Sequence, residues 1–224
     1  MDCCSVNGLD KVFSRSVAQR QLKNYLKKGL GRRAQQMVDF LKEQEITGAT
    51  ILEIGAGIGS LHLELIKAGA AEAVGYDASP AYVEAATALA ERLGLKESVE
   101  YHLGDFVELA FSAPVMDIVI LDRVICCYPD MNALMTVAGQ RTKRLCVLTY
   151  PRRARWVRIA FYTGNLVQTL LRREFRAYLH HPQQVSVVLG AQGLSGMFKA
   201  TAGFLGLWEI AVYQRQEAEV SPSS

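Results

Sequence analysis

A short apolar run that ends directly in a glycine-rich turn, at residues 51–59, constrains the fold more than any other feature. The segment reads Ile-Leu-Glu-Ile-Gly-Ala-Gly-Ile-Gly and leads at Ser60 into a helical pattern. A strand that passes through glycines into a helix is typical of an open α/β sheet, because glycine permits the tight turn and the close approach of a ligand. Ligands of such sheets bind at the carboxyl ends of the strands, so this turn is predicted to be a binding loop.

Further Val- and Ile-rich runs alternate with helical patterns along the chain. The expected strands are Thr50–Ile54, Ala73–Tyr76, Val99–Leu103, Met116–Leu121 and Leu145–Thr149. The expected helices are Arg32–Glu45, Ser60–Ala68, Pro80–Leu93, Met131–Gly139 and Arg155–Phe175. This alternation indicates βαβ units and a single open, mostly parallel sheet with helices on both faces.

The pattern changes after Pro182. One helix up to Gly193 precedes two strand patterns, Leu194–Lys199 and Trp208–Gln214, with no helix between them. Two consecutive strands without a crossover indicate an antiparallel C-terminal hairpin at the edge of the sheet. We therefore expect an α/β domain over residues 46–215, followed by a disordered polar tail over 216–224.

Residues 1–45 are expected to form a helical arm. Basic and apolar side chains alternate here, which fits a solvated amphipathic helix packed on the domain. The alternative is a lid that closes over a substrate, with Tyr25 on its apolar side. The sequence leaves both interpretations open.

Charge and cysteine content restrict the class of protein. The 224 residues carry 25 basic and 22 acidic side chains, a balance that argues against a general nucleic-acid binder. Five cysteines, as two vicinal pairs and a singleton, offer no C-x-x-C spacing and no predicted metal site. The first residues lack the pattern of a signal peptide, so a reducing, cytoplasmic location is expected.

The chemistry of the glycine turn favours S-adenosylmethionine over a dinucleotide. The spacing is G-x-G-x-G, with Ser60 where a dinucleotide fingerprint has its third glycine. The acid Glu53 precedes the first glycine by two residues, where it would repel a diphosphate but attract an ammonium group. The residues assigned to the donor at this turn are Glu53, Gly55, Ala56, Gly57 and Gly59.

Two further strand ends contribute to the predicted donor site. Asp77 ends the second strand, twenty residues after Gly57, where a carboxylate can accept both ribose hydroxyls; Ala78 follows it. A helix N-terminal acid is the competing interpretation. Gly104, Asp105 and Phe106 close the third strand, where they would recognise and flank an adenine ring, with a plain turn as the alternative.

The ordered set from Glu53 to Phe106 resembles the class I S-adenosylmethionine-dependent methyltransferases over roughly residues 45–150. That resemblance implies a Rossmann-like methyltransferase fold with seven strands, the last one reversed. It also implies that S-adenosylmethionine is the methyl donor.

A narrower resemblance is to the magnesium-protoporphyrin IX O-methyltransferase family. It rests on Cys127-Tyr128-Pro129, on Arg176-Ala177-Tyr178-Leu179-His180 and on the arm with Tyr25. The resemblance implies methylation of a propionate carboxylate. This sequence departs from the family at Cys127, which replaces a histidine, and a thiol is a poorer base than imidazole near neutral pH.

Methyl transfer from a sulfonium depends mainly on positioning, and a carboxylate acceptor is ionised at pH 7 and needs no base. The predicted activity is therefore methylation of an oxygen, a carboxylate or a hydroxyl, on a small and possibly acidic molecule. Tyr128 and His180 are the acceptor-side catalytic candidates, and Asp122 is a further acid with a capping or Arg123-paired alternative. The alternatives are a catalytically inactive binding protein with the same fold and a carboxyl methyltransferase of the magnesium-protoporphyrin type.

A basic stretch over residues 141–176 holds ten basic side chains and one acid. It admits three interpretations: an exposed helix face, a site for an acidic substrate, or contact with an anionic membrane or RNA through interleaved aromatic residues. RNA is the weaker option, because no added RNA-binding domain fits in a chain of this length. Contact with a membrane surface remains open.

Overall fold

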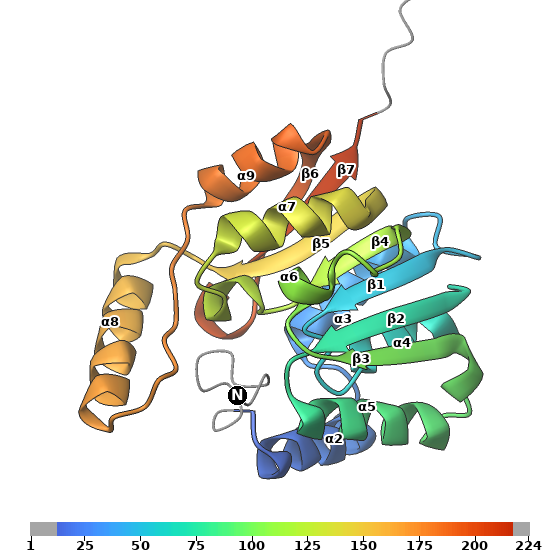
Figure 1. Cartoon of the computed structure of the whole chain (residues 1–224), viewed down its shortest axis with the longest axis horizontal. Helices are drawn as coiled ribbons and strands as arrows, with labels where there is room; N and C mark the ends of the chain where they lie inside the picture. The colour runs from blue at the N-terminus through green and yellow to red at the C-terminus, as the bar shows by residue number, and fades with distance from the viewer. Residues whose placement is uncertain (1–12, 217–224) are drawn as a thin grey trace, which may run out of the picture.

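One seven-stranded sheet organises the computed structural model, which describes residues 13–216 (Figure 1). The strands are β1 (Thr50–Ile54), β2 (Glu72–Asp77), β3 (Val99–Leu103), β4 (Met116–Leu121), β5 (Thr142–Pro151), β6 (Leu194–Ala202) and β7 (Trp208–Arg215). Their spatial order is β3-β2-β1-β4-β5-β7-β6. The neighbours from β3 to β5 are parallel, whereas β7 runs antiparallel to both β5 and β6. The predicted mostly parallel sheet with a C-terminal antiparallel hairpin is confirmed.

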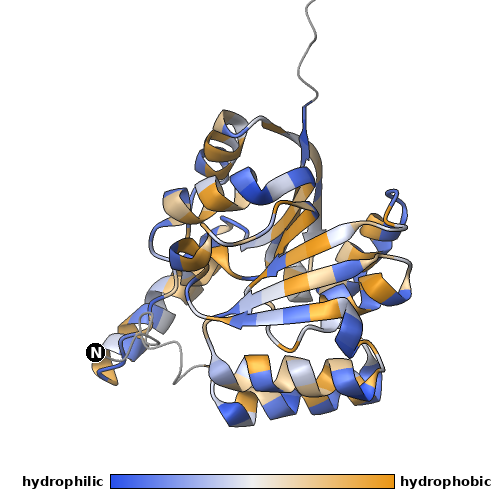
Figure 2. Cartoon of the chain, turned by 45° about the vertical axis from the view of Figure 1, so that its right-hand side comes forward, coloured by the Kyte–Doolittle hydropathy of each residue, from blue (hydrophilic) through white to orange (hydrophobic). Residues whose placement is uncertain are grey.

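Helices cover both faces of this sheet. They are α2 (Arg15–Lys28), α3 (Arg32–Lys42), α4 (Ser60–Lys67), α5 (Pro80–Arg92), α6 (Phe106–Leu109), α7 (Met131–Arg141), α8 (Arg155–Leu170) and α9 (Pro182–Ala191), with short 3₁₀ turns η1 (Lys96–Ser98), η2 (Ile125–Cys127) and η3 (Phe204–Gly206). α6, α7 and α9 pack on one face, and α3 and α4 pack on the other. Along the helices that flank the sheet, hydrophobic residues alternate with hydrophilic ones (Figure 2).

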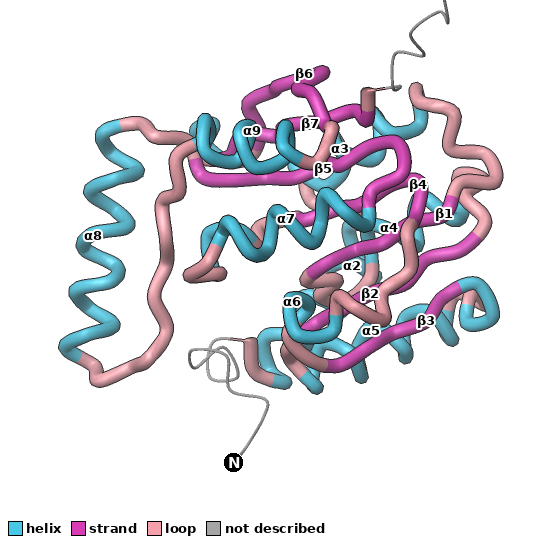
Figure 3. The backbone as a smooth tube through the Cα atoms, turned by 45° about the horizontal axis from the view of Figure 1, so that its top comes forward, coloured by secondary structure: helices cyan, strands magenta, loops and turns pink. Residues whose placement is uncertain are grey.

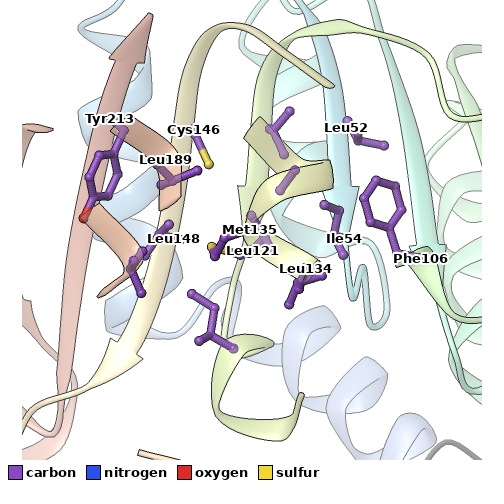
Figure 4. Packing of buried hydrophobic residues seen from close by; sticks show 14 of the residues in the cluster. Leu52, Ile54, Phe106, Leu121, Leu134, Met135, Cys146, Leu148, Leu189 and Tyr213 are labelled. Atoms are coloured by element: carbon purple, nitrogen blue, oxygen red, sulfur yellow. The ribbon is translucent and has the colours of Figure 1, made fainter. Parts of the chain in front are cut away.

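The two-residue period of the strands builds two separate cores. Leu52 and Ile54 point towards α6 and α7, while Ile51, the residue before Leu52, points towards α3 and α4. Figure 4 shows the first core, in which Leu121, Leu134 and their neighbours interlock between sheet and helices. Each fully buried aliphatic side chain contributes about 1.5–3 kcal/mol. The alternation therefore fixes which face of each strand meets which helix layer.

α2 packs on the outside of α5 and α4 through a third cluster that includes Ala18, Tyr25 and Leu89. α3 belongs to the main body, because Met37, Val38 and Leu41 are buried against the sheet. The division into an arm over 1–45, a domain over 46–215 and a tail over 216–224 stays a prediction. Residues 1–12 and 217–224 of that division lie outside the described residues.

α8 ends earlier than the sequence predicts. The expected helix Arg155–Phe175 stops at Leu170, because Arg172 adopts a left-handed conformation with φ 52°. The Arg173 amide then bonds to the Gln168 carbonyl at 2.9 Å. This pair of features is a Schellman ending, which apolar periodicity alone does not reveal.

α8 also stands away from the sheet. Figures 1 and 3 both show it joined to the body only by the chain that leaves β5 and by the segment that returns to α9. The segment over 171–181 passes η2 on its way, where the Tyr178 amide donates to the Cys126 carbonyl at 2.8 Å. Within residues 13–216, no helix has the length and apolar character that crossing a bilayer requires.

Candidate functional site

A cavity of about 250 Å³ opens at the carboxyl ends of β1, β2, β3 and β4. Its walls come from the residues that follow each of these strands, and Phe13 and Gln21 close it from the N-terminal side. The candidate residues from the sequence that line it are Gly55, Gly57, Asp77, Ala78, Gly104, Asp105, Phe106, Asp122 and Tyr128. The strand ends thus bring most of the predicted donor residues to one place.

The glycine turn forms the floor of this cavity. Gly55, Gly57 and Gly59 have φ values of 68°, 57° and 74°, which side chains rarely tolerate. A Cβ at Gly55 would collide with the Val124 side chain, and one at Gly59 would lie 2.5 Å from the Tyr101 hydroxyl. The turn therefore requires glycine for both its conformation and its packing.

Asp77 joins the end of β2 to the glycine turn. Its two carboxylate oxygens accept hydrogen bonds from the Gly57 and Ser79 amides, each at 2.8 Å. Burial raises the pKa of Asp77 to about 6, although both amide hydrogen bonds oppose the shift. The two amide bonds thus hold the carboxylate in place at the cavity wall, although burial disfavours its ionised form.

Asp105 and Tyr128 meet across the cavity. The Asp105 carboxylate caps α6 by accepting from the Val107 amide at 2.9 Å. The Tyr128 hydroxyl donates to the same carboxylate, at 3.0 and 2.9 Å from its two oxygens. Burial, and then the bond to Asp105, raises the pKa of Tyr128, so the phenol stays protonated near neutral pH. Phe106 lies beside this pair with its ring edge against Tyr76.

Glu53 faces a buried network beneath the glycine turn. Its Oε2 accepts a hydrogen bond from His62 Nδ1 at 2.5 Å, and His62 Nε2 lies 2.8 Å from the Tyr101 hydroxyl. Burial raises the pKa of Glu53 against the opposing effect of His62. Glu53 is absent from the described lining of the first cavity, and its predicted contact with an ammonium group stays a prediction.

An ion pair that sequence reasoning missed lies at the tip of β4. Arg33 of α3 donates to Asp122 through Nε and Nη2, each at 2.7 Å, and Thr149 donates to the same carboxylate at 2.8 Å. Burial alone would raise the pKa of Asp122, but the hydrogen bonds and charge of Arg33 hold it below its ordinary value. The Arg123 pairing that the sequence offered is also present, as a longer contact in which Arg123 Nε lies 3.9 Å from the carboxylate. No local signal marks Arg33 as the main partner, because 89 residues separate it from Asp122.

This ion pair borders a second cavity of about 550 Å³ between the α2–α3 turn and the glycine turn. Glu53, Ala56 and Tyr25 line it, and the residues shared with the first cavity are Gln21, Gly55, Gly57, Asp122 and Arg123. The two cavities are therefore neighbours across the tip of β4. Gly59 is absent from the described lining of either one.

The N-terminal helix closes the site from outside. Gln21 donates to the Tyr82 hydroxyl at 2.6 Å, and the Ser79 hydroxyl donates to the Phe13 carbonyl at 2.9 Å. Tyr25 is buried and donates to Glu64 on α4. α2 thus packs on the domain, as the first interpretation expected, and its Gln21 and Tyr25 also line the cavities. Its action as a lid over a substrate stays a prediction.

His180 lies behind the cavity wall. Its Nε2 donates to the Tyr128 carbonyl at 2.9 Å, and its ring stacks on Tyr178. Cys126 and Cys127 line the cavity with their sulfur atoms 3.7 Å apart. The predicted pair Tyr128 and His180 is thus brought together through the Tyr128 backbone, and its catalytic role stays a prediction.

Known proteins share both sequence and fold with this chain. A family model described as a methyltransferase domain matches residues 46–184, more than half of the chain. Ribosomal protein L11 methyltransferase of Escherichia coli is 35% identical over 66 residues, which are 30% of this chain and 22% of that protein. The match thus spans less than a quarter of the length of these curated relatives.

Two solved structures have the same fold. Magnesium protoporphyrin IX methyltransferase from Synechocystis PCC 6803, with bound SAH, has a TM-score of 0.72 at 21% identity and covers 93% of this chain and 98% of its own. An O-methyltransferase family protein from Burkholderia thailandensis has a TM-score of 0.73 at 15% identity and covers 96% of this chain and 65% of its own. The family model, the sheet order and the glycine turn agree, and the chain belongs to the S-adenosylmethionine-dependent methyltransferases.

Proposed function

We propose that this enzyme methylates an oxygen, a carboxylate or a hydroxyl, on a small organic acceptor. The observation that carries the proposal is the cavity wall beyond the donor residues, where the Arg123 cation lies and the Asp122 carboxylate is already bound by Arg33. Arg123 lines both cavities and is 46% exposed at its side chain, so it can pair with an acidic acceptor. A carboxylate acceptor is already ionised and requires only this kind of positioning.

The described residues fit the donor. Asp77 offers carboxylate oxygens suited to ribose hydroxyls, and Asp105 with Phe106 offers an edge for a flat base. The Arg33–Asp122 pair presents both charges at the junction of the cavities, where they suit the ammonium and carboxylate groups of an amino acid. S-adenosylmethionine, when bound, supplies an activated methyl group on a sulfonium.

In this proposal, Tyr128 and His180 act on the side of the cavity where the methyl acceptor binds. Tyr128 acts as a neutral hydrogen-bond donor, because its raised pKa excludes an ionised phenolate at pH 7. His180 holds the Tyr128 carbonyl and so positions the turn that follows β4. Tyr25, fixed on Glu64, forms part of the covering helix rather than of the reacting groups.

Titration calorimetry with S-adenosylhomocysteine, with NAD as a control ligand, tests the donor assignment. We expect binding of the homocysteine compound alone and its loss in Asp77→Ala, whereas the exposed Glu97→Ala retains it. Unchanged affinity in Asp77→Ala would contradict the donor site.

Methyl transfer to pooled carboxylic acids and phenols then tests the acceptor. A methyl ester releases methanol in base, whereas a methyl ether resists it, so product lability separates the two acceptor classes. Donor binding with no transfer to any pool would favour the alternative of an inactive binding protein, to which the Cys127 replacement points.

A carboxyl methyltransferase of the magnesium-protoporphyrin type is a second candidate. The observation that favours it is the fold match over 93% of this chain and 98% of the Synechocystis enzyme. Turnover of magnesium-protoporphyrin IX by the wild type would establish it. Turnover only in Cys127→His would indicate that this chain has a different acceptor.

The described thiols fit a reducing compartment such as the cytoplasm. Cys126, Cys127 and Cys146 are free, and two of them line the cavity. Localisation of a tagged full-length chain by cell fractionation tests this part of the proposal.

A further inference from the structure

α8 carries an apolar stripe that faces away from the protein. Exposed hydrophobic side chains recur along it at the spacings of one helix side: Trp156, Ile159, Tyr162, Leu166, Val167 and Leu170. Their exposure ranges from 45 to 73%, whereas Val157 on the opposite side is fully buried. We call these six residues the outward stripe.

Specific contacts fix this orientation. The Asn165 side chain, on the side away from the stripe, donates to the Ala177 carbonyl at 2.8 Å and accepts from the Ala177 amide at 2.9 Å. These bonds tie α8 to the returning segment, which is itself attached to η2. The stripe therefore faces outward because the opposite side of the helix, with Val157 and Asn165, is held inward.

Arginines surround the outward stripe. Six are exposed before, within and after α8: Arg152, Arg153, Arg155, Arg158, Arg172 and Arg173. Among ion pairs between described residues, none includes one of these six. Glu174 is the single acid between residues 141 and 176.

The arginines at the start of α8 disfavour the helix itself. The helix dipole places partial positive charge at the N-terminus, and the first turn of α8 contains no acid. Their concentration there is better explained by an external anionic surface than by helix stability.

We propose that the outward stripe and its six arginines bind the surface of an anionic lipid bilayer. A helix with an apolar side, basic flanks and aromatic residues lies in the plane of the membrane interface, with its apolar side among the acyl chains. At 16 residues, α8 matches this surface mode and not a membrane crossing.

A second copy of the chain is a poorer occupant of this surface. Pairing of two α8 stripes would bring two sets of six arginines together with only two copies of Glu174 to offset them. A bilayer that contains phosphatidylglycerol instead supplies many negative charges beside an apolar interior. Charge complementarity therefore favours lipid.

Bilayer binding would bring the acceptor side of the cavity close to lipid. The segment after α8 bonds directly to the Cys126 and Tyr128 carbonyls at the cavity wall. An acceptor that partitions into lipid could then enter from the membrane. This consequence rests on the proposed function, whereas the binding itself does not.

Co-sedimentation with vesicles of phosphatidylglycerol and phosphatidylcholine, against vesicles of phosphatidylcholine alone, tests the proposal. We expect the wild type to bind the anionic vesicles and to dissociate as salt rises. Ile159→Glu/Leu166→Glu should reduce binding to the level seen with phosphatidylcholine. The matched control, Phe111→Glu/Val187→Glu, alters exposed apolar residues outside α8 and should bind as the wild type does.

Neutralising the arginines separates charge from apolar insertion. Arg155→Gln/Arg158→Gln should weaken vesicle binding by roughly fivefold per arginine and flatten its salt dependence. Calorimetry with S-adenosylhomocysteine checks that each variant keeps its fold and its donor site. Loss of vesicle binding can therefore be distinguished from failure of the donor assignment.

A spectroscopic measurement locates the contact on α8. Vesicles of brominated phosphatidylglycerol should quench the fluorescence of Trp156, and Trp156→Phe should remove that quenching. Absence of wild-type binding, wild-type affinity in the stripe variant, or an unquenched Trp156 would each overturn the proposal. A concentration-dependent dimer that the stripe variant abolishes, without vesicle binding, would assign this surface to a second copy instead.

Discussion

The donor side and the acceptor side of the cavity are built in different ways. On the donor side, Gly57, Asp77 and Asp105 follow successive strands and are fixed by backbone hydrogen bonds. On the proposed acceptor side, α2, η2 and the segment over 171–181 come from distant parts of the chain and meet through side-chain contacts as well as the backbone bond from Tyr178 to Cys126. If the proposed function holds, donor binding depends on the sheet itself, whereas acceptor binding depends on elements added around it.

Asp77→Ala should give the largest effect on the donor side. It removes a charged acceptor of two predicted hydroxyl contacts, each worth about 1.5–3 kcal/mol, so affinity for S-adenosylhomocysteine should fall at least about 100-fold. Calorimetry measures the affinity, and thermal unfolding verifies the fold. If the affinity falls by less than about tenfold, donor binding does not depend on Asp77 at the end of β2, and the proposed difference between the two sides is wrong.

Arg33→Ala should give the next largest effect, on stability. It leaves the buried Asp122 carboxylate without its charge partner, which costs about 3–5 kcal/mol in the free energy of unfolding. Urea unfolding measures this change. Arg15→Ala is the control, because its pair with Glu84 is exposed and is worth about 0–1 kcal/mol. If both substitutions lower the free energy of unfolding equally, the Arg33–Asp122 pair is not needed to attach α3 to the site.

The pH dependence of donor binding should follow Asp77. Its pKa is raised from 3.8 to about 6, so the carboxylate takes up a proton as pH falls through 6, and donor affinity should drop by up to about tenfold per pH unit below that value. The contribution of Asp77 to the free energy of unfolding changes with pH in the opposite direction from donor affinity. The folded state binds the proton first, so this contribution rises as pH falls from 6 towards 3.8.

Calorimetry across pH 5–8 measures this dependence, and Asp77→Asn should remove it. An identical pH profile in Asp77→Asn would assign the titration to another group.

Tyr128→Phe should give the smallest effect on donor binding. Asp105 keeps its hydrogen bond from the Val107 amide, so affinity for S-adenosylhomocysteine should change by only a few-fold. Methyl transfer should fall more than donor affinity, because Tyr128 lies on the acceptor side in our proposal. If donor affinity falls more than the rate of methyl transfer, Tyr128 belongs to the donor side of the cavity instead.

Much of the fold follows from local patterns. Short runs rich in Val and Ile predicted the strands, and the absence of a helix between the last two predicted the hairpin. The sequence did not predict that α8 ends at Leu170, because that ending depends on a left-handed Arg172 and a local hydrogen bond. Nor did it predict α6, a four-residue helix that begins after the capping Asp105.

Much less of the site could be predicted. The residues at the ends of β1, β2 and β3 were found because parallel strands end at one edge of a sheet. The contact between Glu53 and His62 was missed, since a histidine within a helical pattern carries no sign of its partner. A covering arm was one of two interpretations of the N-terminal helix, but Phe13 and Gln21 were not identified as cavity residues, because an amphipathic pattern does not show which side chains reach the cavity.

Features with local causes follow directly from the amino-acid sequence: the strands, the glycine turn and the acids at the strand ends. Which distant groups meet depends on tertiary packing, as in the pairing of Arg33 with Asp122 and of Tyr128 with Asp105. Tertiary packing also decided that the apolar stripe of α8 faces outward. The physical reason is that backbone conformation depends on neighbouring residues, whereas ion pairs and exposed faces depend on how whole elements pack against one another.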